Sequence, residues 1–213
     1  MKIKINEIYK SIQGESSYSG IPCTFIRFTF CNLRCSYCDT EYAFYDGNDM
    51  TIDKIIEEVD KLNCHLVEIT GGEPLLQPGY IKLIEKLENN NYKVLVETGG
   101  ALSIKEISKK THIILDLKCP SSNMEDRNLF ENLKYLKKTD EVKFVIGNKE
   151  DYKWTKSIIE KHELNKKCSI LISPVYNRIN PKEIVDWILE DNLDVRFQLQ
   201  IHKEIWDEKT KGV

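Results

Sequence analysis

The sequence lacks any apolar run long enough to cross a membrane, and its amino terminus, MKIKINEIYK, lacks the hydrophobic stretch of a secretory signal. It also lacks a surplus of one charge, because 31 lysines and arginines stand against 34 aspartates and glutamates. The resulting net charge of -3 indicates no basic surface for nucleic acid. We therefore expect a cytoplasmic protein that contacts neither a membrane nor nucleic acid.

Linkers, internal repeats and low-complexity tracts are absent too, so we expect residues 1–213 to form one domain with a buried core. What is present is an alternation of two patterns. Amphipathic helical patterns, such as those over 52–62, 81–87, 154–159 and 184–189, separate several nearly continuous apolar segments. These segments, which we expect to be strands, are 23–30, 65–70, 92–98, 112–118, 141–147, 168–174 and 195–200. The alternation predicts an α/β fold with a parallel sheet, either open or closed into a partial barrel.

Polar and unusual residues follow the expected strands at their carboxyl ends. GGEP follows the second expected strand, and ETGG, DLKCPS, SPVYN and QIHK end or follow later ones. In parallel α/β folds the carboxyl ends of the strands, and the loops after them, form the functional site. The sequence therefore predicts one site assembled from several loops.

The loop after the first expected strand, CNLRCSYCDTEY, holds Cys31, Cys35 and Cys38. A structural zinc site uses four ligands, and the remaining cysteines are isolated, with Cys23 and Cys168 placed as packed thiols in apolar strands. Three thiolates on a [4Fe–4S] cluster leave one iron open to an external ligand. An odd count of seven cysteines also disfavours a secreted disulfide framework, although a zinc or redox cluster is an alternative.

The C-x3-C-x2-C spacing and the following GGEP (71–74) resemble the radical S-adenosylmethionine (SAM) enzymes. This resemblance implies a partial (βα)6 barrel in which SAM binds the open iron and is cleaved to a 5′-deoxyadenosyl radical. Tyr37 matches the aromatic residue that packs near the adenine. Glycine at 72 would let the backbone approach the methionine amino group.

Within that superfamily the chain resembles the 7-carboxy-7-deazaguanine synthases of the queuosine pathway. Six motifs occur in the family's order between about residues 5 and 204, and they are SIQGE, F-x-R, CDT, TGGEP, ET-x-G and Q-x-H-K. The resemblance implies a lyase that converts 6-carboxy-5,6,7,8-tetrahydropterin to 7-carboxy-7-deazaguanine with loss of ammonia. Hydrogen would be abstracted from C6, and SAM would be regenerated.

The resemblance also implies site residues. Residues 1–22 would form an N-terminal substrate-binding extension. The expected substrate contacts are Ile12, Gln13, Gly14, Glu15, Arg27, Thr70, His202 and Lys203. The expected cofactor contacts are Tyr37, Cys38, Asp39, Gly72, Glu73, Asp116, Leu117, Lys118, Ser173, Pro174, Val175 and Tyr176. Thr40 would bind Mg²⁺, and relatives are homodimers that take electrons from a donor such as flavodoxin or ferredoxin.

The sequence leaves several alternative residue roles and functions open. Arg27 lies in an apolar strand and could form a structural salt bridge, and Asp116 and Lys118 share a strand face and could pair with each other. A glycyl-radical enzyme activase would share the cysteine loop, and a non-catalytic iron–sulfur or zinc module would bind metal alone. Ser16 and Gly99 depart from the family's usual residues. The polar tail, 205–213, is expected to fray.

Overall fold

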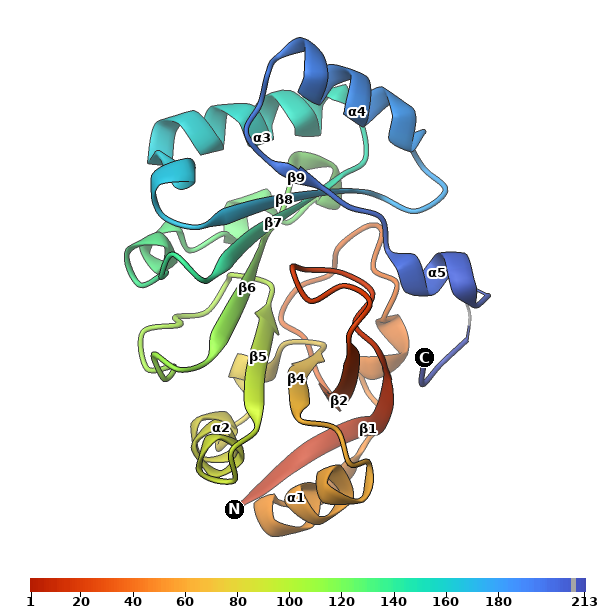
Figure 1. Ribbon diagram of the computed structural model, residues 1–213, viewed down its shortest axis with the longest axis vertical. Coiled ribbons are helices and arrows are strands. Elements are labelled where there is room, and N and C mark those ends of the chain that lie inside the picture. The colour runs from red at the N-terminus through yellow and green to blue at the C-terminus, as the bar shows by residue number, and fades with distance from the viewer. Residues whose placement is uncertain (208–209) are drawn as a thin grey trace.

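The computed structural model describes residues 1–207 and 210–213, and their strands form a single nine-stranded sheet in the order β3-β1-β2-β4-β5-β6-β7-β8-β9. The strands from β2 through β9 in this order run parallel, while β1 pairs antiparallel with both β2 and β3. Figure 1 shows the strands arranged in an arc around the connection between β1 and β2. The strand bounds are β1 Lys2–Ile12, β2 Pro22–Phe28, β3 Asn48–Thr51, β4 Leu66–Gly71, β5 Lys93–Thr98, β6 His112–Leu117, β7 Glu141–Ile146, β8 Ser169–Pro174 and β9 Arg196–Phe197.

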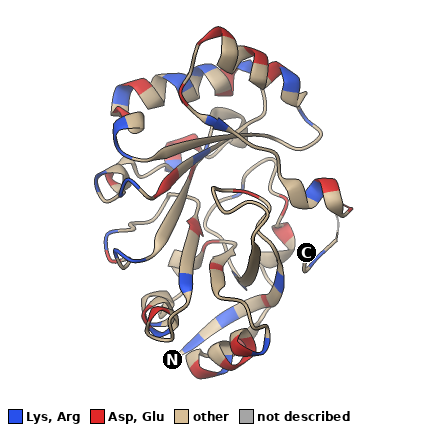
Figure 2. Cartoon of the chain, viewed as in Figure 1, with Lys and Arg blue, Asp and Glu red and all other residues tan. Residues whose placement is uncertain are grey.

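Helices cover the outer face of the sheet, with α3 and α4 on the β7–β9 side and α1 and α2 near the N-terminus (Figure 1). Their outer surfaces carry acidic and basic residues side by side (Figure 2). Short 3-10 turns take the place of an α-helix between β6 and β7. The helix bounds are α1 Ile52–Lys61, α2 Tyr80–Asn89, α3 Lys149–His162, α4 Pro181–Glu190 and α5 Ile201–Ile205.

Helices α1, α3 and α4 begin where the sequence supplies a capping side chain. Thr51 accepts a hydrogen bond from the Lys54 amide at the start of α1, and Asn148 accepts one from the Asp151 amide at the start of α3. At α4, Asn180 caps the helix and Pro181 occupies its first turn. Helices α1 to α4 bury their apolar stripes against the sheet, which makes the larger hydrophobic core.

The inner face of the arc is layered because strand side chains alternate between faces. A smaller apolar cluster of Cys23, Phe25, Leu66, Leu95 and Ile114 fills its lower part. Two residues further along the same strands the inward positions become charged or polar, and they are Arg27, Glu68, Glu97 and Asp116. An apolar base therefore supports a polar site at the carboxyl ends of the strands.

The sequence predicted the parallel strands and missed the antiparallel edge. Residues 1–22 were expected to be an extension, yet their first half is β1, a full member of the sheet that pairs with β2. The strand expected over 195–200 contains only Arg196 and Phe197. Leu189, expected to face the core, is 68% exposed because it lies near the end of α4.

Candidate active site

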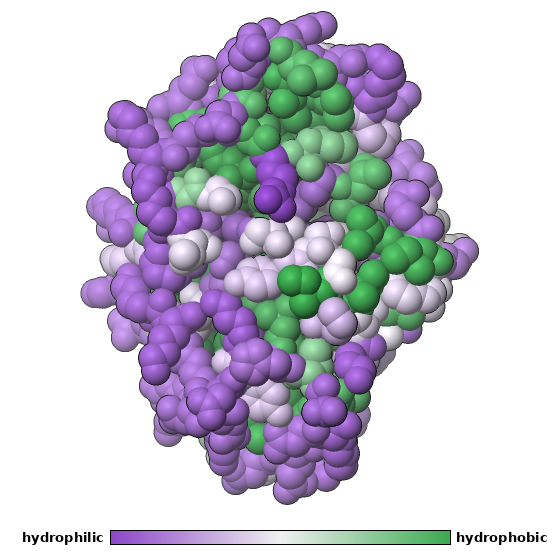
Figure 3. All heavy atoms as spheres, in the orientation of Figure 1, coloured by the Kyte–Doolittle hydropathy of each residue, from purple (hydrophilic) through white to green (hydrophobic). Residues whose placement is uncertain are grey.

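One cavity of about 750 Å³ opens at the carboxyl ends of the strands. That volume suits a drug-sized ligand or two small ones. On the face seen in Figure 3, hydrophilic residues lie mainly at the margins, while apolar and intermediate residues occupy much of the middle of this face. The cavity brings together these predicted residues: Ile12, Gln13, Gly14, Glu15, Arg27, Cys31, Cys35, Tyr37, Cys38, Asp39, Thr40, Thr70, Gly72, Asp116, Lys118, Val175, Tyr176, His202 and Lys203.

The cysteine loop is fixed at both ends. On one side the Gly72 and Glu73 amides donate to the carbonyl oxygens of Phe28 and Phe30, at 3.1 and 2.7 Å. A Cβ atom on Gly72 would overlap the Phe30 carbonyl, so glycine is required for this approach. On the other side the Ser36 amide and hydroxyl donate to the loop after β6. The backbone thus holds the three cysteines at the edge of the cavity.

All three thiols are free and half-buried. Burial raises the pKa of Cys31 and Cys35, and it raises that of Cys38 to about 11. Within the described residues, no three His, Cys, Asp or Glu side chains form a group that could hold a metal ion. The fit to a [4Fe–4S] cluster rests instead on soft thiol donors, all unpaired, on one loop facing one cavity.

Beside the cysteine loop, Asp116 and Lys118 project from the end of β6. Their charged groups lie 3.1 Å apart, so the pairing that their shared strand face left open as an alternative does occur. One carboxylate oxygen of Asp116 is buried and has no hydrogen-bond partner among the described residues. Such a group is costly unless a ligand donates to it, so this position fits an amino or hydroxyl donor of a cofactor. Tyr37, across the cavity, is held by a long 3.4 Å hydrogen bond from its hydroxyl to the Val145 carbonyl.

The middle of the cavity holds a buried charge network that we call the acidic floor, formed by Glu15, Glu68 and Glu97 around Lys143. The Lys143 ammonium contacts Glu15 at 2.7 Å, Glu97, and Asp116 at 3.5 Å. Gln13 donates to Glu68. Burial raises the pKa of Glu68, and the neighbouring Glu97 and Glu15 carboxylates raise it further. Burial opposes ionisation of Glu15 too, but Lys143 holds its pKa below the usual value.

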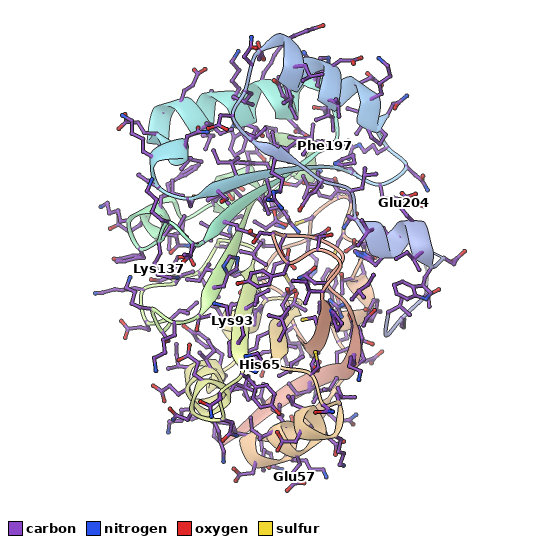
Figure 4. The ribbon with its side chains drawn as sticks, in the orientation of Figure 1. Glu57, His65, Lys93, Lys137, Phe197 and Glu204 are labelled. Carbon is purple, nitrogen blue, oxygen red and sulfur yellow. The ribbon has the colours of Figure 1, made fainter. Side chains whose placement is uncertain are left out.

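The C-terminal helix α5 closes the side next to the β1–β2 connection. The Ile201 amide donates to the Gly14 carbonyl at 3.0 Å, and a Cβ atom on Gly14 would run into the His202 ring. Lys203 forms a 2.6 Å ion pair with Asp39, whose other oxygen accepts from the Thr40 hydroxyl at 2.8 Å. Burial lowers the pKa of His202 and so favours its neutral form. In Figure 4, Glu204 marks this helix beside the C-terminal segment.

Four residues expected to contact the cofactor do not line the cavity: Glu73, Leu117, Ser173 and Pro174. Glu73 is fully buried, and its carboxylate accepts from the Leu75 amide, the Thr98 hydroxyl and the Gly99 amide at 2.8–3.0 Å. It therefore ties the end of β4 to the end of β5. The Ser173 hydroxyl accepts from Gln198, which links β8 to β9.

Sequence reasoning missed other residues that line the cavity, chiefly Tyr9, Tyr42, Glu68, Glu97 and Lys143. The three charged ones had a signal, since each lies in a mainly apolar strand segment. The two tyrosines had none, because tyrosine is ordinary in a strand and in a loop.

The C-terminal tail also reaches the cavity. Of the segment 205–213 that was expected to fray, residues 208 and 209 lie outside the described residues, and residues 210–213 line the cavity. The Lys211 ammonium lies 4.4 Å from the centre of the Tyr42 ring. Among the described residues no helix is both long and apolar enough to span a membrane.

Comparison with known proteins matches residues 25–188 to the Radical SAM superfamily. The chain is 45% identical to the 7-carboxy-7-deazaguanine synthase of Koribacter versatilis, covering 99% of this chain and 100% of that protein. It is 42% identical to that of Chlorobaculum tepidum, covering 99% and 97%. The crystal structure of QueE from Escherichia coli has the same fold, with a TM-score of 0.78, 20% identity, and coverage of 93% and 94%. The chain therefore belongs to the radical SAM superfamily and, within it, to the 7-carboxy-7-deazaguanine synthase family.

Proposed function

We propose that this protein converts 6-carboxy-5,6,7,8-tetrahydropterin to 7-carboxy-7-deazaguanine and ammonia. The observation that supports this most is one cavity lined by two chemically different sets of groups. One set is the free thiols and an unpartnered Asp116 oxygen, and the other is Arg27 and the acidic floor. Full-length similarity to proteins named 7-carboxy-7-deazaguanine synthase supports the same reaction.

Cys31, Cys35 and Cys38 would hold the [4Fe–4S] cluster. Together with SAM it supplies reversible hydrogen-atom abstraction at C6 of the substrate. Asp116 and Lys118 would orient SAM, because a carboxylate and an ammonium complement its amino and carboxylate groups. Tyr37, Gly72, Val175 and Tyr176 would shape the rest of that pocket, and Glu73 would act by holding the strand ends rather than by contact.

The substrate carboxylate would bind Arg27, whose planar guanidinium matches a planar anion. The remaining polar edge of the pterin would face Gln13, Gly14, Glu15 and Thr70, with His202 and Lys203 closing the entrance. The salt bridges around Lys143 keep Glu15 ionised and fixed before the substrate arrives. Preorganised groups of this kind lower the cost of ordering the ligand.

Thr40 and Asp39 offer a hydroxyl and a carboxylate at the cavity edge, which are the oxygen donors that Mg²⁺ prefers. We assign Thr40 to Mg²⁺ on this basis. We also infer a homodimer, a flavodoxin- or ferredoxin-type electron donor, and a reducing cytoplasmic location, where the half-buried cluster thiols would stay reduced.

Equilibrium binding separates this proposal from its two rivals. The anaerobic, cluster-loaded protein with SAM should bind 6-carboxytetrahydropterin, and the Arg27→Ala variant should bind it much more weakly. A glycyl-radical enzyme activase, which acts on a protein, would bind no pterin. A non-catalytic metal module would show an electron paramagnetic resonance spectrum of the reduced cluster that SAM leaves unchanged.

A further inference from the structure

Arg27 is held by three side chains from two separate parts of the chain. Its Nε donates to Glu7 Oε1 at 2.7 Å, and its Nη2 donates to the Tyr9 hydroxyl at 2.8 Å. The Tyr42 hydroxyl donates to the same Glu7 oxygen at 2.8 Å. Glu7 and Tyr9 belong to β1, whereas Tyr42 follows the cysteine loop.

The guanidinium is also enclosed by rings. Its central carbon lies 5.9 Å from the centre of the Tyr9 ring and 5.8 Å from that of Tyr42. Tyr9 in turn stacks on Phe25, with ring centres 5.1 Å apart. The arginine side chain is only 15% exposed, so its orientation is fixed by contacts on several sides.

These contacts occupy one edge of the guanidinium and leave the other available. Nε and Nη2 form the edge that faces Glu7 and Tyr9. The Nη1 atom of Arg27 has no hydrogen-bond partner among residues 1–207 and 210–213. Arg27, Tyr9 and Tyr42 line the cavity, whereas Glu7 does not. Glu7 therefore holds the arginine from behind, and the Nη1 end is the part that can meet a ligand.

We propose that Glu7, Tyr9 and Tyr42 are positioning residues that aim the Nη1 end of Arg27 into the cavity, and that this makes the enzyme selective for a substrate bearing a planar carboxylate. The inference rests on the proposed function, because it assumes that Arg27 binds the substrate carboxylate. It goes further by naming the side chains that act through Arg27. It also gives the N-terminal strand a specific part in substrate choice.

The structure distinguishes positioning from competition. If Glu7 merely neutralised Arg27, it would compete with the incoming carboxylate, and removing its charge would strengthen binding. A guanidinium has a second edge, however, and the Tyr42 hydroxyl shares the Glu7 oxygen that accepts from Nε. Removing the Glu7 charge or the Tyr42 hydroxyl should therefore loosen Arg27 and weaken binding of the substrate carboxylate, since charge-assisted hydrogen bonds depend on geometry.

The test compares two ligands on anaerobic, cluster-loaded enzyme with SAM: 6-carboxytetrahydropterin and tetrahydropterin, which lacks the carboxylate. Glu7→Gln and Tyr42→Phe should weaken binding of the carboxylated ligand by about ten- to a hundredfold. Binding of the ligand without the carboxylate should stay within about twofold. The matched control is Tyr92→Phe, which removes a hydroxyl that donates to Asp60 far from the cavity and should change neither affinity.

A double-mutant cycle tests whether Glu7 acts through Arg27. In an Arg27→Ala background, Glu7→Gln should cause no further loss of affinity for the carboxylated ligand. The proposal is overturned if Glu7→Gln strengthens binding of that ligand, if both ligands weaken equally, or if the two substitutions add. Failure of the proposed function would look different, because the wild-type enzyme would then not distinguish the two ligands at all.

Discussion

The Lys143 ammonium lies 2.7 Å from the Glu15 carboxylate and joins β7 to the β1–β2 connection across 128 residues of sequence. Both side chains are largely buried, and Glu97 and Asp116 surround the same ammonium. One cation therefore holds together three strands and the connection that lines the substrate side of the cavity. A buried charge with this many partners is both a structural and an electrostatic element of the site.

Replacing Lys143 with Met should lower the free energy of unfolding by about 3–5 kcal/mol at neutral pH, because it leaves buried carboxylates without a counter-ion. Lys143 holds the folded pKa of Glu15 below its unfolded value. The stability from this pair is therefore present above the unfolded pKa and is lost as the pH falls through the folded pKa. Urea denaturation of the metal-free protein should show a large loss at pH 7 and a much smaller one at strongly acidic pH.

The control is Lys86→Met, which removes an exposed ion pair with Asp53 and should leave the free energy of unfolding nearly unchanged, because solvent screens exposed pairs. Equal losses for Lys143→Met and Lys86→Met would contradict the structural part assigned to Lys143.

Glu68→Gln should have the opposite effect on stability. Burial and the nearby carboxylates raise the folded pKa of Glu68 above its unfolded value. Its protonated form is thus favoured in the fold, and the associated stability is lost as the pH rises through the folded pKa. The neutral amide should raise the melting temperature of the metal-free protein at pH 8 by about 2–4 °C per kcal/mol gained. At pH 4 the two proteins should melt together, and a lower melting temperature for the variant at both pH values would refute this reading.

The sequence predicted the parallel strands because their apolar runs are nearly continuous, and the predicted site residues Cys31, Arg27 and Lys118 line one cavity. It did not predict β1, because the expected strands were the nearly continuous apolar runs, whereas KIKINEIYKSI alternates polar and apolar residues as a half-buried strand does. Nor could it predict that Glu73 would bind backbone amides. That assignment depends on how two strand ends meet, which a motif alone does not specify.

Gly72→Ala should abolish assembly of the cluster while leaving the fold intact. Its Cβ atom would overlap the backbone of Phe30, which cannot move without displacing the cysteine loop. Iron analysis after anaerobic reconstitution should find little bound iron, while circular dichroism stays close to wild type. The control is Gly20→Ala, which lies outside the cysteine loop and strains the backbone at a φ of +87°, but whose Cβ atom meets nothing within 4 Å, so iron content should stay normal. Normal iron content in Gly72→Ala would contradict the close approach described above.

Glu73→Ala should destabilise the protein by about 2–4 kcal/mol. Its removal leaves buried hydrogen-bond donors at the ends of β4 and β5 without an acceptor. Glu106→Ala, at an exposed turn, serves as the control and should be close to neutral. Denaturation of the metal-free proteins gives the comparison. If Glu73→Ala keeps full stability and loses only SAM binding, Glu73 contacts the cofactor after all.

The most direct test of the proposed function is product formation. Anaerobic enzyme with reductant, SAM, Mg²⁺ and 6-carboxytetrahydropterin is analysed by mass spectrometry beside Cys35→Ala and Cys64→Ser. We expect 7-carboxy-7-deazaguanine from the wild type and from Cys64→Ser, whose thiol lies outside the cysteine loop, and none from Cys35→Ala. Formation of 5′-deoxyadenosine without any deazaguanine would contradict the substrate assignment and favour the activase.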